Sequence, residues 1–301
     1  MADYNPPPLS WSQSTRKRFE TCRRRHFYHR HWGQCEDKWR VYEMRCITTL
    51  AKLRGGLVHD IISGALRAVR HGKLVSIEEA RQNVTDILLE KFRESYYKVW
   101  ADFEKRQGRK PADICNLHEH YYNYPDVDQR ARDSRAIAWK CLENAMGGEL
   151  WESIVNSDPK EWMEIEEEGF PHFDLEGIKV YSIIDFAHKC EQPTIIDWKT
   201  GPQHHSDREQ LLVYSLYAES RWGWEPTETT LKAVYLYPDY HIEECRASAE
   251  EVESTRQMIK QSFDEMLSLE SAFGPVDMNN FPRTDNKQDC EWCRFRKLCG
   301  V

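Results

Sequence analysis

The chain has 301 residues, which is long enough to bury a sizeable core, and 40% of them are hydrophobic. No apolar run in the sequence reaches the roughly 18 residues of a membrane helix, so the composition excludes a membrane-spanning protein. The formal net charge of −8 excludes a protein that coats nucleic acid by general electrostatics, and any contact with nucleic acid must be local.

The chain contains ten cysteines, whose roles depend on the compartment. Residues Met1 to Tyr4 lack the basic and apolar regions of a signal peptide, so we expect a cytoplasmic protein without disulfides. The cysteines must then be core residues, metal ligands or catalysts, and their spacing decides which.

The first element in chain order is a helix from Arg16 to about His31, capped by Ser12 or Ser14. Cys22 is then expected inside the helix rather than in a loop. This stretch is basic, either as a solvated helix face or as a local contact to nucleic acid. Its basic residues are Arg16, Lys17, Arg18, Arg23, Arg24, Arg25 and Arg30.

Residues 50–150 follow a mostly helical pattern, which includes 58–68 and 77–99. A polar, tyrosine-rich stretch near 111–125 interrupts it. We predict that 50–150 is a helical insertion or subdomain within a single domain that spans residues 1–301.

Short alternating or β-branched segments then predict a sheet core in residues 160–247. The expected strands are 162–170, 179–188, 194–198, 230–237 and 241–246. Ser206 with Glu209 forms a capping box that predicts a helix to about residue 222, and Ser248 with Glu251 predicts a long helix to about Phe273. These elements predict an α/β fold.

The sharpest local motif is Asp197-Trp198-Lys199 at the end of an apolar strand. Residues i and i+2 of a strand share a face, so Asp197 and Lys199 lie together. Asp185 ends another apolar segment, and a strand hairpin would bring it beside Asp197. Two carboxylates suit Mg²⁺ or Mn²⁺, and Lys199 can orient or deprotonate an attacking water. This set suits phosphodiester hydrolysis.

Two further features support this interpretation. Gln210 and Tyr214 are four residues apart on the predicted helix and share a face, and His59 lies in the first turns of an apolar helix after Gly55-Gly56. Alone, each of these residues would be an ordinary structural one.

Together these residues resemble the RecB-like branch of the PD-(D/E)XK nuclease superfamily, whose order is a helical His, a strand Asp, an Asp/Glu-x-Lys strand and a Gln-x-x-x-Tyr helix. The order matches in full, although Ser182 stands where the family often has Gly. The resemblance implies a restriction-endonuclease-like core, with a central mixed sheet flanked by helices. The implied metal ligands are His59, Asp185, Asp197 and the Trp198 carbonyl, the implied catalytic amine is Lys199, and the implied DNA contacts or site supports are Gln210 and Tyr214; Glu166 is a further acidic candidate.

The C-terminal residues Cys290, Cys293 and Cys299 form a C-x₂-C-x₅-C triplet, and a metal centre of that kind requires a fourth ligand from elsewhere. The segment around Cys22 resembles the one that supplies the first cysteine in iron-sulfur members of the same branch, such as the CRISPR-associated adaptation nuclease and nuclease domains of helicase-nuclease recombination complexes. The resemblance implies a 4Fe-4S cluster held by residues 22 and 290–299. Zinc is the alternative metal, and Cys35 is the alternative fourth ligand.

The implied activity is that of a metal-dependent DNA nuclease, an exonuclease that favours single-stranded DNA. The chain has no P-loop motif, so unwinding would need a partner, such as a helicase, a recombinase or an integrase. One alternative is a catalytically silent DNA-binding or assembly subunit, which decay of the active site would reveal. Another is a redox switch in which the cluster gates activity.

Overall fold

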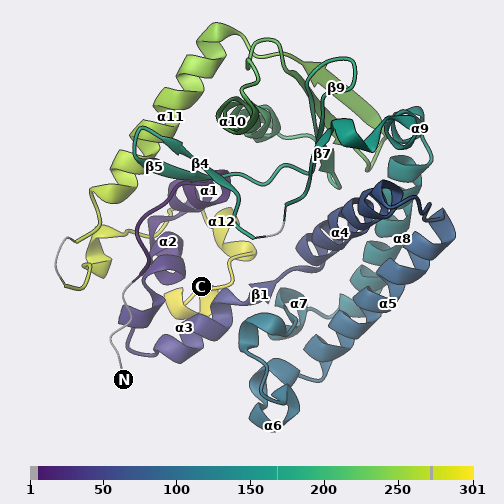
Figure 1. Ribbon diagram of the computed structural model, residues 1–301. Helices are drawn as coiled ribbons and strands as arrows, with labels where there is room; N and C mark the ends of the chain where they lie inside the picture. Colours follow the sequence, from purple (N-terminus) through teal and green to yellow (C-terminus); the bar gives the residue numbers. More distant parts are fainter. Residues whose placement is uncertain (1–5, 168, 272–273) are drawn as a thin grey trace. The chain divides into compact units, whose positions relative to one another are not determined.

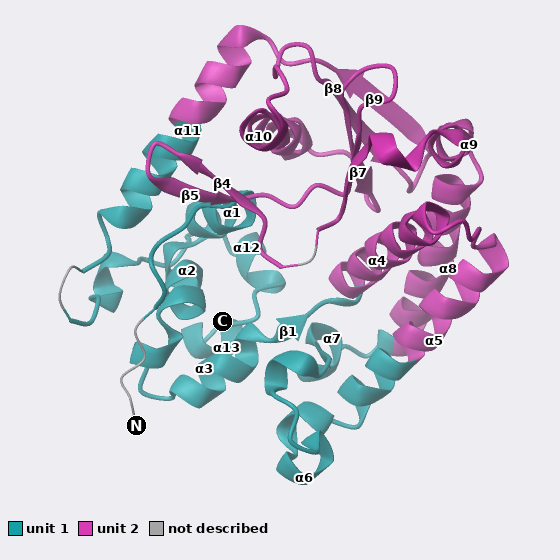
Figure 2. Cartoon of the chain, in the orientation of Figure 1, with its two compact units in different colours: residues 1–50, 90–127, 258–301 teal, residues 51–89, 128–257 magenta. Residues whose placement is uncertain are grey.

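The computed structural model describes residues 6–167, 169–271 and 274–301. Two expectations concern residues outside these ranges, namely the lack of a signal peptide at Met1 to Tyr4 and the helix limit at Phe273. The chain divides into two compact units, each assembled from segments far apart in sequence (Figure 2). Unit 1 contains Met1–Leu50, Glu90–Val127 and Met258–Val301, and unit 2 contains Ala51–Leu89 and Asp128–Gln257. The predicted insertion, residues 50–150, is mostly helical and contributes to both units.

Helices and strands follow one another as Figure 1 labels them. The α-helices are α1 (Gln13–Thr21), α2 (Arg23–Arg30), α3 (Lys38–Arg45), α4 (Leu50–Arg70), α5 (Ile77–Tyr96), α6 (Phe103–Arg106), α7 (His118–Tyr121), α8 (Val127–Met146), α9 (Glu149–Asn156), α10 (His205–Trp222), α11 (Ala249–Leu267), α12 (Gln288–Glu291) and α13 (Arg296–Cys299). The strands are β1 (Ile47–Thr48), β2 (Asn116–Leu117), β3 (Trp162–Ile165), β4 (His172–Leu175), β5 (Ile178–Tyr181), β6 (Phe186–His188), β7 (Thr194–Lys199), β8 (Thr230–Tyr235) and β9 (His241–Cys245). Within the described residues, no helix is long and apolar enough to cross a membrane.

Unit 2 is built on a five-stranded sheet in the order β3-β6-β7-β8-β9. β6 is antiparallel to β3 and β7, whereas β7 and β8 are parallel and are joined through α10. A parallel pair needs such a crossover, because a tight turn can join only antiparallel neighbours. The prediction of an α/β fold with a mixed sheet is confirmed.

The two faces of β7 have different surroundings, because successive side chains of a strand alternate. Ile196 and Trp198 pack into an apolar cluster with residues of α4, α8 and α9. Asp197 and Lys199 occupy the alternate face, where α10 lies along β7 and β8 (Figure 1). The strand thus places its polar pair on the α10 face.

Two predicted strands were too long. β3 ends at Ile165 because Glu166 has a left-handed backbone with φ 36°. The predicted strand 179–188 is two strands, since β5 pairs with β4 in a hairpin and β6 belongs to the main sheet. The hairpin turns at Glu176 and Gly177, both with positive φ, as a two-residue turn requires. Asp185 therefore directly precedes β6 and does not end a long strand.

The predicted helix from 16 to 31 is interrupted at Cys22, whose extended backbone (φ −163°, ψ 111°) separates α1 from α2. Ser12 caps α1 by accepting the N–H of Thr15, as predicted. Cys22 is half-buried at the junction. The prediction that it lies within a continuous helix was wrong.

The helix after β7 begins at His205, and its capping box was misassigned. The backbone N–H of His204 donates to Oδ2 of Asp207, so the box joins this pair, whereas the prediction had joined Ser206 with Glu209. The second box is as predicted, because Ser248 and Glu251 exchange hydrogen bonds at the start of α11. That helix ends at Leu267, short of the expected limit.

Candidate active site

Two buried carboxylates meet where β6 and β7 run side by side. The strands are antiparallel with Phe186 opposite Ile196, so the residue before one and the residue after the other are neighbours. Asp185 is 8% exposed and Asp197 is 2% exposed. Oδ2 of Asp185 accepts the backbone N–H of Trp198 at 2.7 Å, which fixes this carboxylate against β7.

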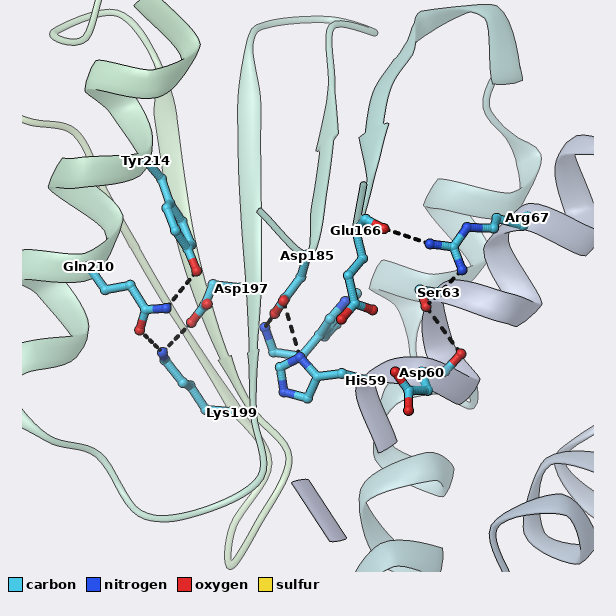
Figure 3. A network of polar contacts seen from close by, with 11 residues as sticks. His59, Asp60, Ser63, Arg67, Glu166, Asp185, Asp197, Lys199, Gln210 and Tyr214 are labelled. Atoms are coloured by element: carbon cyan, nitrogen blue, oxygen red, sulfur yellow. Dashed lines mark hydrogen bonds and ion pairs between the residues drawn. The ribbon is translucent and has the colours of Figure 1, made fainter. Parts of the chain in front are cut away.

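Each carboxylate has a basic partner from unit 2 (Figure 3). Nζ of Lys199 lies 2.5 Å from Oδ2 of Asp197. Nδ1 of His59, on α4, lies 3.1 Å from Oδ1 of Asp185. The predicted acidic, basic and histidine residues are therefore together in space, although 126 positions separate His59 from Asp185.

Helix α10 completes the arrangement. Lys199 Nζ donates to Oε1 of Gln210 at 2.7 Å, and Nε2 of Gln210 donates to the hydroxyl of Tyr214 at 2.5 Å. Gln210 and Tyr214 are one helical turn apart, so they face the same way. Both predicted residues thus reach the site, because Gln210 contacts Lys199, and Tyr214 contacts both Gln210 and Asp197.

The charges of this site are strongly coupled. Burial and the neighbouring Asp185 raise the pKa of Asp197, and Lys199 opposes the rise. Burial lowers the pKa of His59, but the attraction of Asp185 outweighs it and the net pKa is about 9. For Lys199, burial also lowers the pKa, and Asp197 with Asp207 more than compensates. Two buried carboxylates side by side are a favourable environment for added positive charge.

The chain before Asp185 is held by Glu166 and Arg67. The N–H of Glu166 donates to the carbonyl of Asp185 at 3.0 Å, and the Glu166 carbonyl accepts from Arg67 at 2.6 Å. Burial raises the pKa of the Glu166 carboxyl, while a hydrogen bond from Ser63 opposes it. Glu166 therefore lies at the edge of the site, as Figure 3 shows.

The donor set fits a divalent cation in its chemistry. Carboxylates and a backbone carbonyl are the oxygen ligands that Mg²⁺ or Mn²⁺ prefers, and the His59 imidazole would have to lose its proton to join them. Among the described residues, however, no three His, Cys, Asp or Glu side chains are already arranged to hold a metal ion. His59 and Asp185 instead pair with each other, so binding would require the imidazole and the carboxylate to turn apart.

The cysteines predicted as cluster ligands lie in unit 1, where they line one cavity of about 230 Å³: Cys22, Cys290, Cys293 and Cys299. Burial raises the pKa of the Cys293 and Cys299 thiols, and proximity to Cys22 raises both further. Cys35 does not line this cavity, and its thiol faces the His31 carbonyl at 3.9 Å. The geometry therefore favours Cys22 over Cys35.

Much of the basic stretch in α1 and α2 is engaged inside unit 1. Arg16 pairs with Glu20, and Arg30 pairs with Glu270 at 2.7 Å. Arg24 donates to the carbonyl of Phe281. The contacts of Arg24 and Arg30 link α2 to the C-terminal segment, whereas the Arg16 pair lies within α1.

Sequence reasoning missed Asp207 and Tyr235. Oδ1 of Asp207 lies 3.7 Å from Nζ of Lys199, and the Tyr235 hydroxyl donates to Oδ2 at 3.1 Å. The available signal was an acidic residue three positions before Gln210 and three after the helix cap His204. Ser206 and Glu209 offered the more familiar capping pattern, and Tyr235 reads as an ordinary strand residue.

The chain is similar to one protein family and to a solved structure. A model of the "PD-(D/E)XK nuclease superfamily" matches residues 10–300. A crystal structure named "Putative exonuclease", from Eubacterium rectale, is similar at 10% identity with a TM-score of 0.32, covering 72% of this chain and 91% of that one. No curated protein matches the chain. Because the family match spans both the carboxylate site and the cysteines, the chain belongs to the PD-(D/E)XK nuclease superfamily, whose members hydrolyse phosphodiester bonds.

Proposed function

We propose that this nuclease is a divalent-metal-dependent DNA exonuclease that favours single-stranded DNA with a free end. The observation that carries the proposal is the ammonium of Lys199, held between Asp197 and Gln210 at 2.5 and 2.7 Å beside the second buried carboxylate. Nucleases of this superfamily generally use divalent ions such as Mg²⁺. A structural ion pair alone would not explain a second carboxylate in so buried a position.

In this proposal the ligands are His59, Asp185, Asp197 and the Trp198 carbonyl. Bound Mg²⁺ or Mn²⁺ supplies Lewis acidity, which polarises a phosphate and lowers the pKa of a water. The fit rests on the two carboxylates, whose repulsion a cation relieves. His59 and Asp185, which pair with each other at 3.1 Å, would turn from one another toward the ion on binding.

The chain's own residues then have distinct duties. Lys199 orients the attacking water and stabilises negative charge that develops on the phosphate. Gln210 holds the ammonium through Oε1, while its Nε2 is anchored on Tyr214. Such a fixed amide keeps the cation from swinging into solvent, which preserves the geometry of attack.

Single-stranded DNA is the substrate that the RecB-like motif order favours. The net charge of −8 also disfavours extensive contact with a duplex backbone. These 301 residues contain no P-loop motif, so the strand would come from a helicase, a recombinase or an integrase. We propose that this partner supplies the free end.

We also propose that Cys22, Cys290, Cys293 and Cys299 bind a 4Fe-4S cluster in unit 1. The shared cavity supports this, since each sulfur comes from a segment that borders it. Arg25 and Arg283 line the same cavity, and their positive charge opposes the rise that burial causes in the pKa of the Cys293 and Cys299 thiols. A cluster here would link residues near the two ends of the sequence and restrain the unfolded chain.

The test uses protein purified without oxygen and end-labelled single- and double-stranded DNA, with Mg²⁺, Mn²⁺ or a chelator. We expect metal-dependent shortening from an end, faster on the single strand. Lys199→Ala should reduce cleavage by about 100- to 1,000-fold, whereas Lys189→Ala, at an exposed position on the same unit, should cleave like wild type. Undiminished cleavage by Lys199→Ala would contradict the assignment.

A further inference from the structure

Besides Asp197, a second carboxylate faces the ammonium of Lys199 in unit 2, namely Asp207 on the first turn of α10. Asp207 is buried, with 7% of its surface exposed. Because a buried charge is costly unless it is hydrogen-bonded and paired, the partners of this carboxylate indicate its purpose.

Those partners are arranged asymmetrically. Oδ2 accepts two fixed donors, the N–H of His204 at 2.8 Å and the hydroxyl of Tyr235 at 3.1 Å. Oδ1 is directed to Lys199 at 3.7 Å. One oxygen thus anchors the carboxylate to the start of α10 and to β8, while the other presents negative charge to the ammonium.

The sheet fixes the remaining side of this arrangement. Lys199 and Tyr235 are partners in the parallel register of β7 and β8, so their backbones are locked side by side. Tyr235 is 1% exposed, and its ring stacks on His241 with centroids 4.5 Å apart. The Tyr235 hydroxyl is therefore held in a fixed position, and its hydrogen bond fixes the position of the Asp207 carboxylate.

We propose that Asp207 is a positioning residue for Lys199, with Tyr235 as its anchor; the inference rests on the proposed role of Lys199. Asp197 is also a proposed metal ligand, so its charge is shared. The negative charge of Asp207 then acts on the Lys199 ammonium and not on the metal ion. Since Gln210 follows on the same helix, Asp207 also fixes the end of α10 from which the amide reaches Lys199.

The test compares Asp207→Asn with Glu209→Gln, which removes a neighbouring charge from the same helix. Asparagine keeps an oxygen for the His204 N–H but loses the charge. We expect Asp207→Asn to lower kcat about 10- to 100-fold with little change in KM, and Glu209→Gln to leave both unchanged. An unchanged kcat in Asp207→Asn, or an equal loss in Glu209→Gln, would overturn the proposal.

Tyr235→Phe gives an independent test if Asp207→Asn folds poorly, as judged by its Tm. It leaves both charges and removes one anchor, so kcat should fall about 2- to 10-fold; no loss would contradict the role of the anchor. A crystal structure of Asp207→Asn adds a readout without cleavage, because Lys199 Nζ should leave Oε1 of Gln210. If Lys199→Ala is fully active, the proposed function fails, whereas the position of Nζ still tests the inference.

Discussion

The backbone N–H of Trp198 donates to Oδ2 of Asp185, and this one hydrogen bond aligns the two halves of the site. The Trp198 ring is anchored in the apolar cluster beneath the sheet, so the N–H is held rigidly. Asp185 precedes β6 and would otherwise be free to rotate. The contact places its carboxylate beside the segment that carries Asp197 and Lys199.

Asp185→Asn should abolish most cleavage while leaving the fold intact. The amide oxygen can still accept the Trp198 N–H, but the negative charge is lost, so we expect cleavage to fall about 100-fold or more. Loss of the ion pair with His59 destabilises the folded protein, whereas relief of the repulsion between Asp185 and Asp197 stabilises it. The free energy of unfolding should thus change by only about 1 kcal/mol. Urea unfolding and a cleavage assay measure the two effects, with the exposed Asp239→Asn as control.

Tyr214→Phe should lower both stability and activity. The lost hydroxyl is the acceptor for Nε2 of Gln210, so the cost is about 1 to 2 kcal/mol, and the loosened amide should reduce kcat several-fold. Tyr217→Phe is the matched control, because its hydroxyl donates to Glu164 and does not contact Lys199. We expect it to be destabilised without loss of kcat. Equal activity losses in both variants would refute a specific role for Tyr214.

Local pattern predicted much of this site. The two-residue period of β7 places Asp197 and Lys199 on one face, and the helical period places Gln210 above Tyr214; both follow from spacing alone. The family resemblance supplied His59, whose contact with Asp185 no local rule could give. The sequence predicted whether a segment is a strand or a helix better than it predicted where the segment ends, as the ends of β3 and α11 show.

The remaining features depend on contacts that are distant in sequence or on backbone strain. The ending of β3 requires the unusual φ of Glu166, which glutamate rarely adopts. The break at Cys22 could not be predicted because the residues on both sides of it favour a helix. Asp207 is selected by Tyr235, which is 28 residues away, and so its role appears only once β8 is placed beside β7.

Glu270 should make unit 1 sensitive to acid. Burial raises its pKa, but His31 and Arg30 lower it more, to about 2 from an ordinary 4.5. Because the folded pKa is depressed, the stabilisation is present above about pH 4.5 and disappears as the pH falls toward 2. Glu270→Gln should lose about 1 to 3 kcal/mol at pH 7, and its difference from wild type should shrink across that window.

Urea unfolding at several pH values measures this difference. Glu265→Gln is the control, because Glu265 is 62% exposed and its pair with Arg23 spans 3.8 Å. An exposed pair of this kind contributes little. A Glu270→Gln variant whose deficit stayed constant from pH 7 to pH 3 would show that the carboxylate charge is not responsible.

Cys22→Ser should lose iron and acid-labile sulfide, whereas Cys35→Ser should retain both. Cys22 lines the cavity with the C-terminal cysteines, and Cys35 does not. Because a cluster joining distant segments restrains the unfolded chain, its loss should cost about 2 to 4 kcal/mol. Iron and sulfide assays on anaerobic protein, with thermal unfolding, measure these effects; zinc without sulfide would favour the alternative metal.

Cleavage by Cys22→Ser then separates a structural cluster from a redox switch. The carboxylates, His59 and Lys199 all belong to unit 2, whereas the cysteines belong to unit 1. If the cluster only holds unit 1 together, cleavage measured well below the Tm of the variant should stay within a few-fold of wild type. Oxidation and reduction of the wild-type protein should likewise leave cleavage unchanged. A rate that follows the oxidation state would assign the cysteines a regulatory role, because unit 2 contains none of the four.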